Sequence, residues 1–144
     1  MGIIQLRILK TKISEIAASQ TWPLRHEVMW PNMPFDYIKV AGDENALHYG
    51  LWQGEELVTV VSLFIEGKDA QFRKLATRVS EQGKGLGTSI LNHVLTEAKS
   101  KGIKRLWCNA RVDKTKFYEK FGLVKTEQTF TKGGIDFVIL ERYF

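Results

Sequence analysis

Cysteine and proline are scarce in this chain, with one and three residues among 144. A single cysteine, Cys108, excludes an internal disulfide and suits a reducing compartment, so we expect a cytoplasmic protein. The sequence has no apolar run near the ~20 residues that a membrane-spanning helix needs. Residues 1–5 do not combine a charged segment with an apolar one, so we expect neither a membrane protein nor a secreted one.

The length and composition indicate a single globular domain over residues 1–144. Hydrophobic residues make up 44% of the chain and aromatic residues 11%, which are ordinary values for a protein with a packed core. A chain of 144 residues is long enough to bury such a core in one domain. No repeat, low-complexity tract or linker interrupts the sequence.

Charge is distributed unevenly along the chain. Residues 1–70 carry a balance of −3, whereas residues 71–144 carry +8, which gives the overall +5. A basic half attracts a polyanionic ligand. The basic residues are scattered, with no block of five and no regular aromatic interleaving, so we expect no nucleic-acid partner.

A glycine-rich loop, residues 82–88 (QGKGLGT), stands between a strand-like segment at 72–79 and an amphipathic helical segment at 89–101. Glycines at alternate positions let the backbone turn tightly with its N–H groups facing one way. The following helix adds unpaired N–H groups and the positive end of its dipole. Lys84 and Arg78 add full charges, so the loop is a candidate cradle for a phosphate or pyrophosphate.

Two common phosphate motifs do not fit this loop. A Walker A loop needs Lys before the Ser or Thr, and no Lys precedes Thr88. The dinucleotide fingerprint needs a third Gly at position 88 or 90, where Thr88 and Ile90 stand. What remains is Gln-x-x-Gly-x-Gly between a strand and a helix, which resembles motif A of the GNAT superfamily of acetyl-CoA-dependent N-acetyltransferases. A glycine-rich turn without a ligand is the alternative.

Periodicity and turn residues predict the element order β-α-α-β-β-β-α-β-α-β-β. The predicted strands are 3–9, 46–52, 56–65, 70–79, 103–108, 123–130 and 135–142, and the predicted helices are 12–19, 22–30, 89–101 and a short one capped by Asp113 that contains Phe117, Tyr118 and Phe121. Antiparallel strands followed by a βαβ crossover predict a mixed sheet. The resemblance covers nearly the whole chain and implies an α/β (α+β) fold, a twisted sheet of about seven strands with helices on both faces.

The resemblance also implies acetyl-CoA as co-substrate, with no metal. In such proteins the strand before the loop splays from the next parallel strand and offers backbone groups to the pantetheine arm, which here implicates Thr77 and Val79. Asn109, at the end of the next strand, would contact the cofactor or cap a turn. The pyrophosphate would lie on the loop residues Gln82, Gly83, Lys84, Gly85, Leu86, Gly87 and Thr88.

A second segment, residues 116–123 (KFYEKFGL), resembles the family's Phe-Tyr-x-x-x-Gly-Phe element, with Leu123 in place of the last Phe. Tyr118 corresponds to the family tyrosine near the thioester sulfur. A phenol has a pKa of ~10, so it can donate a proton to the leaving thiolate at neutral pH. Tyr118 could instead be a core aromatic residue. Arg111 stands where the family commonly has Asn, seven residues before this tyrosine.

The general base is not evident. Many relatives place Glu on the strand before the loop, but residues 70–75 (AQFRKL) contain no carboxylate. Glu66, Asp69, His48 and His26 are candidates, each of which could equally be structural. Cys108 lies in an apolar segment without a local Cys-His signature, so we expect a buried, inert thiol rather than an acyl-enzyme nucleophile.

The resemblance implies transfer of an acetyl group to an amine by direct attack in a ternary complex. The alternative is a non-catalytic acyl-CoA-binding or regulatory module on the same fold. The acceptor, a small-molecule or peptide amine, would bind near residues 22–30 and 35–43, whose aromatic residues could also simply pack on the sheet. The negative balance of the N-terminal half mildly favours a cationic acceptor. A C-terminal hairpin edge could support a homodimer.

Overall fold

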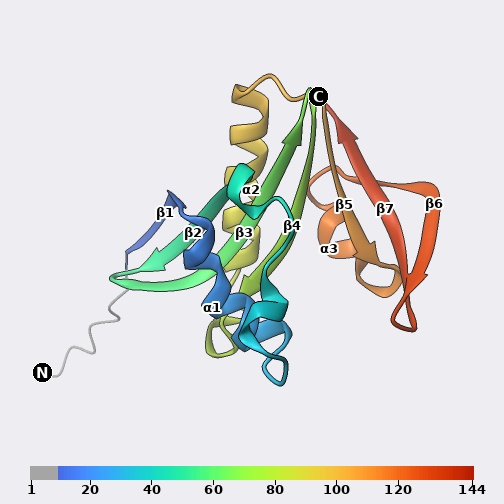
Figure 1. Cartoon of the computed structure of the whole chain (residues 1–144). Coiled ribbons are helices and arrows are strands. Elements are labelled where there is room, and N and C mark those ends of the chain that lie inside the picture. Colours follow the sequence, from blue (N-terminus) through green and yellow to red (C-terminus); the bar gives the residue numbers. More distant parts are fainter. Residues whose placement is uncertain (1–9) are drawn as a thin grey trace, which may run out of the picture.

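A seven-stranded sheet forms the frame of the protein in the computed structural model, which describes residues 10–144. The sheet order is β1-β2-β3-β4-β5-β7-β6 (Figure 1). The strands are β1 (Thr11–Ile16), β2 (Leu47–Gln53), β3 (Glu56–Glu66), β4 (Asp69–Thr77), β5 (Arg105–Arg111), β6 (Val124–Lys132) and β7 (Ile135–Tyr143).

The sheet is mixed, as predicted, because β4 and β5 run parallel while all other neighbours are antiparallel. The parallel pairing is short: it joins Asp69 to Arg105, Ala70 to Leu106 and Gln71 to Trp107. Beyond these pairs the two strands separate (Figure 1). We call the diverging segments, 72–77 of β4 and 108–111 of β5, the wedge.

Helices cover both faces of the sheet, which confirms the predicted layer arrangement. The helix α1 (Ala18–Met29) lies on one face, and α2 (Leu86–Ser100) and α3 (Thr115–Glu119) lie on the other (Figure 1). Four short 3-10 turns complete the described elements: η1 (Phe35–Ile38), η2 (Asp43–Asn45), η3 (Val79–Glu81) and η4 (Val112–Lys114). In residues 10–144 no helix is long and apolar enough to span a membrane.

Two hydrophobic clusters hold these layers together. The larger one joins α2 to the sheet through the helically spaced residues that the sequence predicted, namely Ile90, Leu91, Val94, Leu95 and Ala98. The smaller one joins α1 to the opposite face, with Leu24 of α1 packed near Val60 and Ala76. Burial of these apolar side chains is the main favourable term that holds the helices on the sheet.

The N-terminal third is where the predicted elements are wrong. The predicted helix at 12–19 is instead strand β1, which pairs antiparallel with β2 over six residues, and the Trp52 indole donates a hydrogen bond to Ser14 Oγ at 3.0 Å. Ile13 and Ile16 have the helical spacing of three residues, but the segment forms a strand because it pairs with the otherwise open edge of β2. The predicted strand at 3–9 lies outside the described residues. The order therefore has one helix, not two, before β2 in the described chain.

Other boundaries shift by a few residues. α1 begins at Ala18 rather than at residue 22, because the Gln20 side chain accepts a hydrogen bond from the Ala17 N–H at 2.8 Å and closes the helix start. Pro23 is therefore inside α1 rather than at its start. β4 ends at Thr77, so Val79 belongs to η3 and not to the strand. Asp113 lies in η4 and makes no capping hydrogen bond to α3.

Candidate functional site

The glycine loop presents free N–H donors at the start of α2. Gly83 and Gly85 both adopt left-handed φ values of 79°, and Gly85 is the N-cap of α2, with no side-chain cap. The first N–H groups of the helix therefore have no intrahelical partner. A Cβ added at Gly83 or Gly85 would meet no atom within 4 Å, so the space beside this backbone is open rather than filled by protein. These are the properties of an anion cradle.

Two side chains of the loop have structural partners. The Gln82 amide donates a hydrogen bond to the Thr77 carbonyl at 3.0 Å and ties the loop to the end of β4. Lys84 forms a surface ion pair with Glu81, with its Nζ 3.3 Å from Glu81 Oε1. Thr77 itself receives a hydrogen bond on its hydroxyl from Thr59 at 3.2 Å. These contacts fix the loop geometry on which the donors depend.

A groove of about 460 Å³ brings most of the predicted cofactor residues together. The predicted residues that line it are Thr77, Gln82, Gly83, Gly85, Leu86, Gly87 and Thr88. Val79 lies in η3 and Lys84 in the glycine loop, and neither lines the groove. Asn109 is an exposed residue of β5 in the wedge. Val79 is 66% exposed, because the chain turns away after β4.

The opposite wall of this groove contains residues that the sequence reasoning missed. Phe117 and Lys120 face the loop, and a Cβ added at Gly87 would lie 3.5 Å from the Phe117 ring. Lys120 Nζ lies 4.5 Å from the centre of that ring, so it adds a positive charge beside the N–H donors. The signal was present in the sequence, since Lys120 is within the KFYEKFGL segment.

Tyr118 lies at the apex of the wedge. Its ring is 5.8 Å from that of Phe72 on β4, and the nearby Cys108 on β5 influences its pKa. Phe72 and Cys108 directly follow Gln71 and Trp107, the last residues that pair β4 with β5. Burial, with a smaller contribution from Cys108, raises the pKa of Tyr118 to about 12. Among residues 10–144 no hydrogen bond from the Tyr118 phenol to protein is found and none contributes to its pKa, so its proton is available to a ligand.

Cys108 is buried, as predicted, and is 3% exposed. Burial raises the pKa of its thiol to about 12. Because the thiolate is the nucleophilic form, this thiol is unreactive at neutral pH.

The candidate bases are mostly held by other groups. His48 is buried between Ser62 Oγ at 2.6 Å and the Asp43 carbonyl at 2.8 Å. His26 contacts the Met33 carbonyl at 2.7 Å. Asp69 forms an ion pair with Arg105 at 3.2 Å. Glu66 is exposed at the end of β3 and has no ion-pair partner within the described chain.

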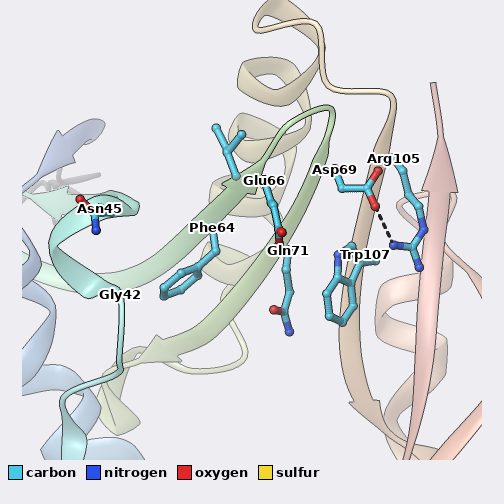
Figure 2. A pocket seen from close by; sticks show the side chains of 9 residues that line it. Gly42, Asn45, Phe64, Glu66, Asp69, Gln71, Arg105 and Trp107 are labelled. Carbon is cyan, nitrogen blue, oxygen red and sulfur yellow. Dashed lines mark hydrogen bonds and ion pairs between the residues drawn. The ribbon is translucent and has the colours of Figure 1, made fainter.

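A second pocket, of about 630 Å³, opens on the α1 face of the sheet. Figure 2 shows Phe64, Gln71 and Trp107 projecting into it from β3, β4 and β5, with the Asp69–Arg105 pair at its far end. Gly42, the N-cap of η2, and Asn45, the last residue of η2, contribute to its wall. Its floor therefore includes the residues at which β4 and β5 begin to separate.

The aromatic residues around α1 largely pack on one another. The Trp30 and Tyr37 rings are 5.4 Å apart, and those of Trp22 and Phe35 are 6.5 Å apart. The Trp22 indole also donates to Asp43 at 3.3 Å. Tyr37 and Phe35 keep exposed fractions of 54% and 45%, so part of this surface remains open to a ligand.

The comparisons with known proteins converge on one family. Residues 20–143 match a family model described as an acetyltransferase (GNAT) domain. The chain is 23% identical over 133 residues to the uncharacterised N-acetyltransferase YitI of Bacillus subtilis, an alignment that covers 86% of this chain and 89% of YitI.

Two solved structures illustrate the shared fold. The ribosomal-protein-S18-alanine N-acetyltransferase of Escherichia coli superposes with a TM-score of 0.76 at 18% identity, over 92% of each chain. A GNAT family acetyltransferase from Elizabethkingia anophelis, with acetyl-CoA bound, gives 0.72 at 17% identity, over 93% of this chain and 98% of that one.

Proposed function

Because the chain belongs to the GNAT acetyltransferase family, we propose that it transfers an acetyl group from acetyl-CoA to an amine by direct attack in a ternary complex. The observation that carries this proposal is the groove at the start of α2, where free N–H donors and Lys120 face one space. In that groove the pyrophosphate would be held by residues 83–88 and Lys120. The acetyl-CoA-bound relative supports the choice of co-substrate.

The wedge supplies the path for the acyl-pantetheine arm. The inner edges of β4 and β5 carry backbone donors and acceptors that have no strand partner across the wedge. An extended arm between them would complete these hydrogen bonds as an added strand does. Its reactive end would then reach the apex, where Tyr118 lies.

Tyr118 would act as the acid. When the amine nitrogen bonds to the acetyl carbon, the carbon–sulfur bond breaks and the sulfur takes the electron pair. The Tyr118 phenol remains protonated throughout the neutral range, because its pKa is raised to about 12. It can therefore give its proton to the sulfur, while positioning in the wedge supplies much of the rate enhancement.

No carboxylate of β4 faces the wedge, since Asp69 is paired with Arg105 at the other end of the strand. An acceptor that arrives as a neutral amine would lose its proton to water after attack. The second pocket, on the α1 face beside the point of strand separation, is the proposed entrance for the acceptor.

A screen of amine acceptors with acetyl-CoA, read by release of the free CoA thiol, tests this function. We expect acceptor-dependent thiol release and the matching N-acetylated product by mass spectrometry. The rival function, a non-catalytic acyl-CoA-binding module, predicts calorimetric binding of acetyl-CoA without thiol release across the screen. Absence of acetyl-CoA binding would contradict both functions.

A further inference from the structure

Two adjacent cations on β4, Arg73 and Lys74, lack a counter-charge. Lys74 is the one lysine among residues 10–144 that is not exposed, and Arg73 is also partly buried. Every other partly or fully buried arginine of the described chain has a carboxylate or carbonyl partner: Arg25 with Asp43, Arg78 with Glu27 and Glu56, Arg105 with Asp69 and Glu141, and Arg142 with the Phe121 carbonyl. Arg73 and Lys74 have none there. Buried charges are normally paired, so this arrangement requires an explanation.

A β-bulge directs both side chains to the α1 face. The register shifts between the pairs Ser62–Arg73 and Val60–Ala76, so β4 has an extra residue opposite β3. Lys74, in this bulge, has a φ of 58°. Arg73 lies over the Phe64 ring at 5.2 Å, and Lys74 Nζ lies over the Trp30 ring at 4.6 Å.

The backbone at Lys74 favours glycine rather than lysine. It is the one non-glycine residue of the described chain with a positive φ, a conformation that costs on the order of 1 kcal/mol for a residue with a Cβ. A lysine that is both strained and desolvated does not serve stability. Such a residue is expected where its side chain has a ligand.

The surrounding charges leave a net positive field at this place. Burial, together with the charges of Arg73, Arg25 and Lys132, lowers the pKa of Lys74 to about 8, against the opposing charge of Asp43. Arg25 and Asp43 form an ion pair and largely cancel each other. An anion at this place would therefore meet two cations in a partly dehydrated, aromatic-walled setting, where charge-assisted hydrogen bonds are strong.

We propose that Arg73 and Lys74 form a carboxylate-binding subsite for the acceptor, so that the acceptor is a small amino acid-like molecule carrying both an amine and a carboxylate. This rests on the proposed acetyl transfer. The subsite adjoins the second pocket through Phe64, whose ring lies under Arg73 and also lines that pocket. It also lies within the wedge segment of β4, beside the proposed place of the thioester. The mild preference for a cationic acceptor rests on the net charge of the whole N-terminal half, whereas this subsite rests on the charges next to Arg73 and Lys74.

Matched acceptors test the charge requirement. Amino acids and their carboxamides have nearly the same size but differ in the anion. With the wild-type protein we expect kcat/KM to be at least about ten-fold higher for the acids than for the amides. The Lys74→Gly variant should lose most of this preference, and Lys104→Gln, which removes an exposed charge elsewhere, should retain it. Equal use of acids and amides by the wild type would overturn the subsite.

A stability measurement separates this role from a structural one. Lys74→Gly relieves the positive φ and removes a desolvated charge, so its urea midpoint should equal or exceed that of the wild type. A structural role for Lys74 predicts a lower midpoint together with loss of activity toward acids and amides alike. That outcome would overturn the proposal.

A binding assay keeps the test independent of turnover. N-acetyl amino acids, which keep the carboxylate, are titrated into CoA-loaded protein and followed by NMR. Saturable binding that Lys74→Gly and Arg73→Gln weaken, but Lys104→Gln does not, supports the subsite. Absence of binding by the whole panel overturns it. Failure of CoA itself to bind would instead contradict the proposed function, and titration of the CoA-free protein would then decide the subsite.

Discussion

The guanidinium of Arg25 and the carboxylate of Asp43 form a buried, two-pronged ion pair, with Nη1–Oδ2 at 2.7 Å and Nη2–Oδ1 at 3.0 Å. Arg25 also donates to the Ile38 carbonyl at 3.2 Å and to Ser62 Oγ at 2.9 Å. One side chain of α1 thereby fixes both the loop that carries η1 and η2 and the strand β3. The loop that forms one wall of the proposed acceptor entrance is thus held in part by this ion pair, together with the contacts of His48 and Trp22 to Asp43.

Removal of one partner of this pair should be costly. Arg25→Met leaves the Asp43 carboxylate buried without its cation, so we expect a loss of about 3–5 kcal/mol in the free energy of unfolding, measured with urea. The double variant Arg25→Met/Asp43→Asn should lose less than the sum of the two single variants. Additive losses would mean that the two groups do not interact energetically.

Acetyl-CoA affinity should depend on the backbone of the glycine loop. Gly85→Asp places a side chain at a φ of 79° and a negative charge among the N–H donors, so we expect affinity to fall by about ten-fold or more. Gly67→Asp is the matched control, because Gly67 has a φ of 63° in the β3–β4 turn and also has open space around it. If calorimetry shows that the two folded variants lose acetyl-CoA affinity equally, the proposed placement of the pyrophosphate is contradicted.

Tyr118→Phe keeps the ring and its packing but removes the proton donor. We expect kcat to fall by roughly 100-fold, the usual scale for a lost general acid, with little change in acetyl-CoA affinity. The unfolding free energy should change by no more than about 1 kcal/mol, because no hydrogen bond contributes to the pKa of this phenol in the described protein. Tyr143→Phe, at a 67% exposed position, is the control. A kcat within two-fold of wild type, with chemistry rate-limiting, would assign Tyr118 to packing alone.

Cys108→Ala should retain activity. The thiol is buried and its pKa is raised to about 12, so it is not the nucleophile of an acyl-enzyme. We expect kcat within about two-fold of wild type and a loss of roughly 1 kcal/mol from reduced packing. Mass spectrometry of the wild-type protein after incubation with acetyl-CoA alone should show no acetylated cysteine. Loss of turnover in a stable Cys108→Ala variant would favour the covalent route.

The charge of Lys74 should make stability depend on pH. Its pKa is lowered to about 8 in the folded state, whereas an unfolded lysine titrates near 10.4. Between these values the unfolded chain binds more protons, so this group contributes stability that increases as pH rises from about 8 to 10. Tyr118 and Cys108 act in the opposite direction, because burial raises their pKa values. The test is therefore the difference in the free energy of unfolding between wild type and Lys74→Met. We expect the variant to be the more stable of the two at pH 7, and this difference to be smaller at pH 10.

Much of the fold was predictable because its signals are local. The apolar spacing of α2, the glycine turns, and the β-branched or aromatic residues of β2, β3 and β7 each indicate their own element. β1 was mistaken for a helix because Ile13 and Ile16 have the helical spacing of three residues. Its strand form follows from its pairing with β2, whose residues lie 32 to 42 positions further along the chain. The loss of regular structure after Thr77 likewise follows from the turn at η3 rather than from residue type.

The site was predictable where the backbone supplies the chemistry. The glycines at 83, 85 and 87 indicate N–H donors directly, and the KFYEKFGL segment marks Tyr118 as the candidate acid, a role that stays a prediction. The proposed roles of Arg73 and Lys74 could not be read from the sequence. They depend on a bulge that turns two neighbouring side chains to the same face of the sheet, and strand alternation would place them on opposite faces.

The outermost strands β1 and β6 give the sheet two open edges, and the separation of β4 from β5 adds two more inside the sheet. Such edges are templates on which another polypeptide can add a strand, which is a common start of aggregation. The bulge at Lys74, with its flanking charge, and the charged residue Arg111 at the end of β5 are features that oppose such pairing. A ligand that fills the wedge would close both inner edges. The concentration of that ligand would therefore influence how well the protein stays in solution.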